Sequence, residues 1–252
     1  MDATARDIVA KVPQVTLGFW ILKILATTLG ETGGDSVSMS MGLGYLAGTA
    51  IFAVLFAGVV VAQILASKFH PVLYWTTIVA TTTVGTTLAD FATREMGIGY
   101  PGGTAILVAL LGGSLAAWYL TLGSISVESV RAPRTEVFYW VTIMFSQTLG
   151  TALGDWTADS LGFGYAGGAG VFGGLLAIVA GAYYFTRVSR TLLFWAAFVL
   201  TRPLGAVVGD LLDKPLAAGG LAMSRYAASG VLIVLIAICI LVFPHKPARG
   251  AH

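Results

Sequence analysis

The stretch Trp75–Asp90, WTTIVATTTVGTTLAD, occurs in recognisable form four times in the chain. The other three copies begin at Trp20, Trp140 and Trp195. Counting from the Trp as position 0, each copy has Gly at position 10, a small residue at 14 and Asp at 15. These residues are Gly30, Gly85, Gly150 and Gly205, and Asp35, Asp90, Asp155 and Asp210. Successive copies start 55, 65 and 55 residues apart, so the chain is built from internal repeats.

The composition indicates the solvent around the protein. Hydrophobic residues make up 57% of the 252 residues and charged residues only 10%, whereas soluble domains carry roughly 25% charged residues. Because so few charges cannot cover a soluble surface, we predict an integral membrane protein. The single cysteine, Cys239, lies in an apolar run, which excludes a disulfide framework and a thiolate metal site.

Eight apolar segments are long enough to cross a membrane as helices. They span residues 15–35, 45–66, 71–91, 103–123, 136–156, 166–186, 191–211 and 221–243. We therefore expect a single all-α transmembrane domain over residues 1–252, with two-helix hairpin repeats at about 15–66, 71–123, 136–186 and 191–243. Since two crossings return the chain to its starting side, the four repeats should be related by rotation about the membrane normal.

A second motif lies between the two helices of each repeat. It reads GLGYLAG, GIGYPGG and GFGYAGG in the first three repeats, beginning at Gly42, Gly97 and Gly162. Glycines permit left-handed backbone and a Tyr suits the water–lipid interface, so the motif predicts a tight turn with an interfacial anchor.

The distribution of basic residues predicts the orientation. The termini and the loops between repeats contain Arg6, Lys11, Lys68, Arg131, Arg134, Arg187, Arg190, Lys246 and Arg249. The turns within repeats hold only Arg94 and Lys214, with Arg225 just inside the last helix. This bias predicts a multi-pass protein of the inner (plasma) membrane with both termini cytoplasmic. The repeat Trp residues should then form an aromatic belt at the inner interface, and the Asp residues should lie toward the outside.

Charged residues inside the odd-numbered segments are the candidates for function, because ionised groups at membrane depth are costly. The acidic ones are Glu31, Asp35, Asp90, Asp155 and Asp210, and the basic ones are Lys23 and Arg202. We expect Arg202 to pair with Glu31 or Asp35 if repeats one and four adjoin. Lys23, on the inner third of its helix, is expected to extend toward the cytoplasmic surface.

Positions 8, 11 and 15 of the repeat lie on one helix face. In the first repeat they are Thr28, Glu31 and Asp35, and Thr83 and Thr148 occupy position 8 of the next two. Together with the four Asp residues they would form an all-oxygen site for a hard cation such as Mg²⁺, Mn²⁺, Ca²⁺ or Na⁺, with Glu31 and the Asp residues as metal ligands. The open alternative is structural, since Thr and Gly also serve close helix packing in lipid.

These repeated T-x-G and G-D elements carry a resemblance. Four tandem two-helix units with a T-x-G…D core resemble the bacterial membrane-protein family defined by the DUF347 repeat, over nearly the whole chain. The fourth copy departs from the pattern, with Pro203 in place of Thr and without the Gly-x-Gly-Tyr turn. The resemblance implies the architecture and brings no activity with it.

Three classes of function follow from these residues. The first is a transporter or channel for a small cation, the second a proton-coupled carrier of a small organic solute, and the third a non-transporting scaffold or partner-binding protein. We expect no enzyme, because the chain has no nucleophile motif and its histidines, His70, His245 and His252, are scattered in loops and the tail. A divalent cation is the one candidate cofactor. The expected partners are lipid, a small cation or protons and, as an open alternative, further copies of the chain, but not nucleic acid.

Overall fold

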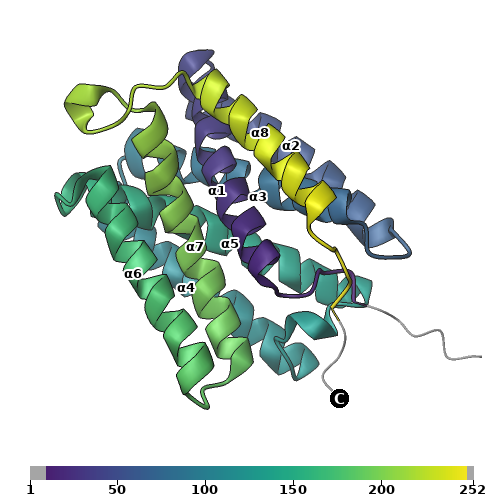
Figure 1. The fold of residues 1–252 in the computed structure, drawn as a ribbon. Coiled ribbons are helices and arrows are strands. Elements are labelled where there is room, and N and C mark those ends of the chain that lie inside the picture. The colour runs from purple at the N-terminus through teal and green to yellow at the C-terminus, as the bar shows by residue number, and fades with distance from the viewer. Residues whose placement is uncertain (1–9, 249–252) are drawn as a thin grey trace, which may run out of the picture.

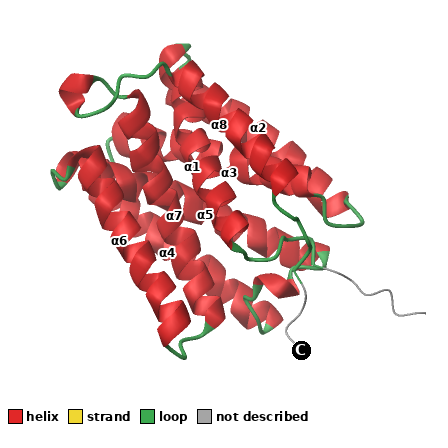
Figure 2. Ribbon diagram, in the orientation of Figure 1, coloured by secondary structure: helices red, strands yellow, loops and turns green. Residues whose placement is uncertain are grey.

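The computed structural model describes residues 10–248, and within this range the chain forms eight α-helices and no sheet (Figures 1 and 2). The helices are α1 (Leu17–Asp35), α2 (Gly44–Leu65), α3 (Pro71–Asp90), α4 (Gly99–Leu122), α5 (Pro133–Asp155), α6 (Gly164–Phe185), α7 (Arg190–Asp213) and α8 (Arg225–Val242). The expected segments match these helices in number and order. The largest shifts are at α4, which begins at Gly99 instead of residue 103, and α8, which begins at Arg225 instead of 221.

The four odd-numbered helices form a closed ring in the middle of the molecule. α1 packs on α3, α3 on α5, α5 on α7, and α7 on α1. The even-numbered helices lie outside this ring, and each packs on the odd helix of the next repeat: α2 on α3, α4 on α5, α6 on α7 and α8 on α1. The expected hairpin therefore describes the connection within a repeat but not the packing.

Close helix packing explains the Gly at position 10 of every repeat. Each of these glycines faces position 7 of the following repeat: Gly30 faces Thr82, Gly85 faces Gln147, Gly150 faces Arg202 and Gly205 faces Thr27. A Cβ atom at position 85 would lie 3.0 Å from the backbone carbonyl carbon of Gln147. Glycine is thus required for the approach of successive inner helices.

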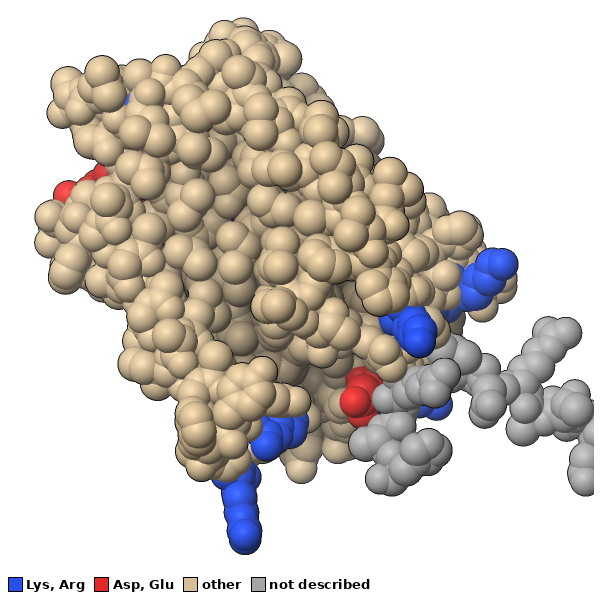
Figure 3. All heavy atoms as spheres, in the orientation of Figure 1, with Lys and Arg blue, Asp and Glu red and all other residues tan. Residues whose placement is uncertain are grey.

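The outer helices carry most of the apolar surface. Five helices are long and apolar enough to cross a membrane, which is consistent with a membrane protein: the outer helices α2, α4, α6 and α8, and the inner helix α7. Large apolar side chains such as Leu120 and Leu241 are exposed on the outer helices. The inner helices α1, α3 and α5 instead carry buried Thr, Gly and charged residues. Charged residues on the face shown in Figure 3 are confined to its two ends.

The turn inside each of the first three repeats has a common construction. A π-helical turn follows the Asp directly, at Ser36–Ser40, Phe91–Glu95 and Trp156–Ser160. Both glycines of the Gly-x-Gly-Tyr motif then adopt positive φ, for example 69° at Gly42 and 78° at Gly44. The predicted tight turn is confirmed.

The described ends of the chain meet on the other side of the molecule from these turns (Figure 1). Gln14 N–H donates to the Lys246 carbonyl at 2.9 Å, and Ala248 N–H donates to the Val12 carbonyl at 2.8 Å. Arg6, Arg249 and His252, named in the sequence analysis, lie outside the described residues.

The expected aromatic belt is wrong for three of the four repeat Trp residues. Trp75, Trp140 and Trp195 are 1%, 2% and 4% exposed and lie in one buried cluster. Tyr74 and Tyr139 belong to the same buried cluster, and their hydroxyl oxygens lie 2.6 Å apart. We define these five residues, with Phe19, Phe194 and Phe198, as the aromatic cluster. Because it fills the end of the inner ring near the chain ends, its rings pack with one another instead of facing lipid headgroups.

Candidate functional site in the buried polar core

Arg202 of α7 lies at the centre of the polar core. Its side chain is fully buried, and Nη2 lies 3.0 Å from Oε2 of Glu31 on α1, which is also buried. Of the two predicted partners of Arg202, Glu31 and Asp35, the structure shows Glu31. Since unpaired charges at this depth are costly, the pair explains how repeats one and four accommodate the two residues that break the repeat pattern.

Position 11 of the repeat supplies the other partners of Arg202. Its Nη2 donates to Thr86 Oγ1 at 2.6 Å and to Thr151 Oγ1 at 2.5 Å. Thr86 in turn donates to the Gly30 carbonyl at 3.1 Å. Position 11 is predicted to lie on the polar face, but Thr86 and Thr151 are not among the predicted site residues. Glu31 at the same position was the signal that could have found them.

The four Asp residues are joined in two pairs by bases from the turns. Lys214 Nζ lies 2.8 Å from Asp35 Oδ2 and 2.9 Å from Asp210 Oδ1. Arg94 Nε lies 2.8 Å from Asp90 Oδ1, and its Nη2 lies 2.8 Å from Asp155 Oδ2. Both bases are predicted only as residues of the turns within repeats. Each follows its own repeat Asp by four residues, which is the spacing of a helical ion pair and the signal that was missed.

The neighbouring carboxylates control the protonation of these two bases. Burial by itself would lower the pKa of Lys214, but Asp210, Asp35 and Asp213 raise that pKa above its ordinary value. Burial likewise opposes the charge of Arg94, whereas the carboxylates of Asp155 and Asp90 raise its pKa. Both bases are therefore cationic at neutral pH.

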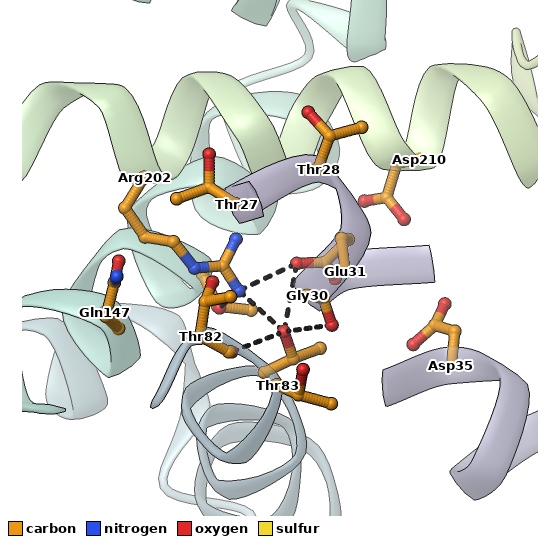
Figure 4. A network of polar contacts seen from close by, with 12 residues as sticks. Thr27, Thr28, Gly30, Glu31, Asp35, Thr82, Thr83, Gln147, Arg202 and Asp210 are labelled. Atoms are coloured by element: carbon orange, nitrogen blue, oxygen red, sulfur yellow. Dashed lines mark hydrogen bonds and ion pairs between the residues drawn. The ribbon is translucent and has the colours of Figure 1, made fainter. Parts of the chain in front are cut away.

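One group of carboxylates has the geometry of a cation site. Glu31, Asp35 and Asp210 each offer an oxygen within 4.8 Å of the others, and all three residues are buried. Figure 4 shows the three carboxylates facing a common space. Asp35 Oδ1 has no hydrogen-bond partner among residues 10–248. Oxygens that bind one hard cation at about 2.1–2.5 Å lie at most about 5 Å apart, so this set fits such an ion.

The position-8 hydroxyls are directed along their own helices. Thr28 donates to Ile24 O at 3.0 Å, Thr83 to Val79 O at 2.8 Å, and Thr148 to Met144 O at 2.9 Å. Their oxygens can still accept or coordinate, but in this arrangement the protons serve the backbone, as Thr does in membrane helices.

The expectation that Lys23 extends to the cytoplasmic surface is wrong. Its side chain is 0% exposed. The ammonium donates to Gln147 Oε1 at 3.3 Å and lies 4.1 Å from the centre of the Phe198 ring. The aromatic cluster and the N-terminal segment, which includes the buried Ala10 and Val12, cover the end of the inner ring at which the described chain ends meet.

The fold and this site together define a helical protein with membrane-compatible outer helices and a buried, charged core shared by four repeats. The family model described as Repeat of Unknown Function (DUF347) matches four times, at residues 18–69, 73–124, 138–189 and 193–243. The chain therefore belongs to the DUF347 repeat family. Comparisons with curated proteins and with solved structures gave no match.

Proposed function

We propose that the chain is an inner-membrane transporter that binds a small hard cation between Glu31, Asp35 and Asp210. One observation carries the proposal. Three buried carboxylates from repeats one and four each offer an oxygen within 4.8 Å of the others, which is close enough for all three to bind one ion. The Lys214 ammonium lies between two of these carboxylates, those of Asp35 and Asp210. Lys214 is in effect a tethered cation. An entering ion of the same sign would replace its ammonium and release the lysine to the turn.

The proposal includes eight membrane-crossing helices and four repeats related by rotation about an axis near the membrane normal. The cyclic packing of each inner helix on the next supports this rotation. The polar residues of α1, α3 and α5 face the interior, which supports their crossing inside the ring of outer helices. The excess of Lys and Arg near the chain ends and inter-repeat loops supports a cytoplasmic location for that side.

The two ends of the polar core favour access from the turn side. Lys214 is 12% exposed there, whereas the aromatic cluster fills the opposite end of the ring. In the proposed cycle the cation enters from the outside. The inner barrier consists of the aromatic cluster together with two buried cations, Lys23 and Arg202, so passage requires a rearrangement of the inner helices. This favours a transporter over an open channel.

The test uses purified protein and liposomes. We expect Mn²⁺, Mg²⁺ or Ca²⁺ to raise the melting temperature saturably and to enter protein-containing liposomes. Asp35→Asn should abolish both effects, since it removes a ligand charge. Asp90→Asn, at the same repeat position beside Arg94, is the matched control and should retain them. Lys214→Gln should shift the cation titration to lower concentration, because it removes the tethered competitor.

The same experiment distinguishes the other classes of function. Wild-type protein that shows no saturable cation effect but dissipates a pH gradient across the liposome would support a proton-coupled carrier instead. Protein with neither activity that purifies with a stable partner would support a partner-binding role.

A further inference from the structure

The half of the polar core nearer the aromatic cluster contains more basic than acidic side chains. Lys23 and Arg202 are both fully buried there. Arg202 has one ion pair, with Glu31, and within residues 10–248 no carboxylate lies at ion-pair distance from Lys23. The contacts of the lysine ammonium are a neutral amide oxygen, Gln147 Oε1, and the face of the Phe198 ring. With Lys23 protonated, this layer has two cations for one paired anion, and an uncompensated buried charge is strongly unfavourable.

Several hydrogen-bond donors in this layer are without acceptors. Arg202 makes all of its contacts through Nη2, while its Nε and Nη1 have no partner in the described part of the chain. The amide nitrogen of Gln147 also has none. The buried hydroxyls of Thr142 and Ser146, one helical turn apart on the same helix, complete the set. A buried polar group without a partner is costly, so these donors favour an acceptor.

The position of Lys23 brings these groups together. Its contact with Gln147 joins α1 to α5, two helices that face each other across the inner ring. Arg202 comes from α7, which packs on both of them. The free donors therefore come from three helices that pack together next to the aromatic cluster, and this layer meets the cation site only at Glu31, the partner of Arg202.

We infer that Lys23, Arg202 and Gln147 form a binding site for a small monovalent anion of the size of chloride. The chemistry is complementary: the side chains offer cationic and amide N–H groups to an acceptor that needs no donor in return. The surplus of one positive charge matches a single negative charge. The close packing around Lys23 and Phe198 favours an inorganic ion over an organic acid.

The test is a thermal-stability titration of the full-length protein at constant ionic strength, with gluconate replaced by chloride or bromide. We expect a saturable rise in melting temperature with either halide. Lys23→Gln should weaken the apparent chloride affinity at least tenfold. Lys68→Gln removes a lysine that is exposed at the same end of the molecule, and it should leave the titration unchanged. Identical melting temperatures of the wild type in chloride and gluconate would overturn the site.

A second variant keeps the test decisive if Lys23→Gln does not fold. Gln147→Glu places a carboxylate beside the Lys23 ammonium, so it should stabilise the protein in gluconate and remove the chloride effect. Retention of the full chloride effect in this variant would contradict the proposal. The two sites meet at the Arg202–Glu31 pair, whereas Asp35 belongs to the cation site alone, so Asp35→Asn should leave the chloride titration intact whether or not cations bind.

Discussion

The junction between repeats four and one resembles that between repeats two and three in its backbone and differs from it in its charges. In both, a base at position 19 joins its own Asp to the Asp of the next repeat. Lys214 does so with one ammonium, a point charge that a metal ion can replace. Arg94 uses two guanidinium nitrogens, a fixed geometry that a spherical ion cannot reproduce. One scaffold thus holds an ammonium junction and a guanidinium junction, and under the proposed function only the ammonium junction exchanges its base for a metal ion.

The two junctions differ again one layer deeper. Position 7 of repeat four, Arg202, is paired with position 11 of repeat one, Glu31. The corresponding residues of repeats two and three are Thr82 and Thr151, both neutral. Charge has therefore been concentrated where repeat four meets repeat one, although the glycine packing is the same around the ring.

The largest expected effect on stability is that of removing Arg202, the central charge of the junction between repeats four and one. Arg202→Ala should lower the free energy of unfolding by about 3–5 kcal/mol, because it leaves Glu31 buried without its partner. Thr82→Ala, the equivalent change at the other junction, should cost less than about 1 kcal/mol, since Thr82 Oγ1 has no hydrogen-bond partner in the described structure. Denaturant titration in detergent measures both.

The double variant provides the control for this prediction. Glu31→Gln should recover part of the loss caused by Arg202→Ala, because it removes the orphaned charge. Strict additivity of the two changes would show that the pair does not interact.

A smaller effect tests whether the two junctions share their backbone packing. Gly205→Ala and Gly85→Ala should each cost about 1–3 kcal/mol through overpacking, since a Cβ would meet the backbone of Thr27 at 2.9 Å and of Gln147 at 3.0 Å. Gly58→Ala on the outer surface of α2, where nothing lies within 4 Å, should be neutral or slightly stabilising. Clearly unequal costs at Gly205 and Gly85 would show that the junctions differ in packing as well as in charge.

Structural features that depend on a single stretch of the sequence, or on a departure from its repeat pattern, could be predicted from the sequence. Hydropathy and the repeat located all eight helices, because an apolar run of sufficient length must satisfy its own backbone. The pairing of Arg202 with an acidic residue of repeat one, Glu31 or Asp35, was also predictable, since a lone buried guanidinium requires a carboxylate and only repeats one and four departed from the pattern. The choice of Glu31 over Asp35 was not.

Features that depend on which helices meet could not be predicted. An apolar helix face is equally compatible with lipid, with its own repeat or with the next one, so the packing of α2 on α3 was hidden. The same ambiguity led to the prediction that Trp75 and Trp140 lie at the interface, whereas both are buried in the aromatic cluster. Lys23 was misplaced for this reason too, because its position in the helix does not reveal that Gln147 reaches it from across the ring.

The smallest expected effect on stability concerns Tyr100, which lies beside the arginine junction at the turn end of the molecule. Tyr100, from the turn motif of repeat two, donates its hydroxyl to Asp159 Oδ2 at 3.1 Å, and its ring centre lies 5.7 Å from the Arg94 guanidinium carbon. Repeat four has lost this Tyr together with its turn motif, so within residues 10–248 the contact is confined to the arginine junction. Tyr100→Phe keeps the ring but removes the hydrogen bond, which at an exposed site should cost less than about 1 kcal/mol. Tyr45→Phe, the equivalent change in repeat one, is the control, because the Tyr45 hydroxyl has no such partner within residues 10–248. A loss well above 1 kcal/mol for Tyr100→Phe alone, measured by the same denaturant titration, would show that the hydroxyl positions Asp159 and Arg94 and that the arginine junction depends on more than its buried carboxylates.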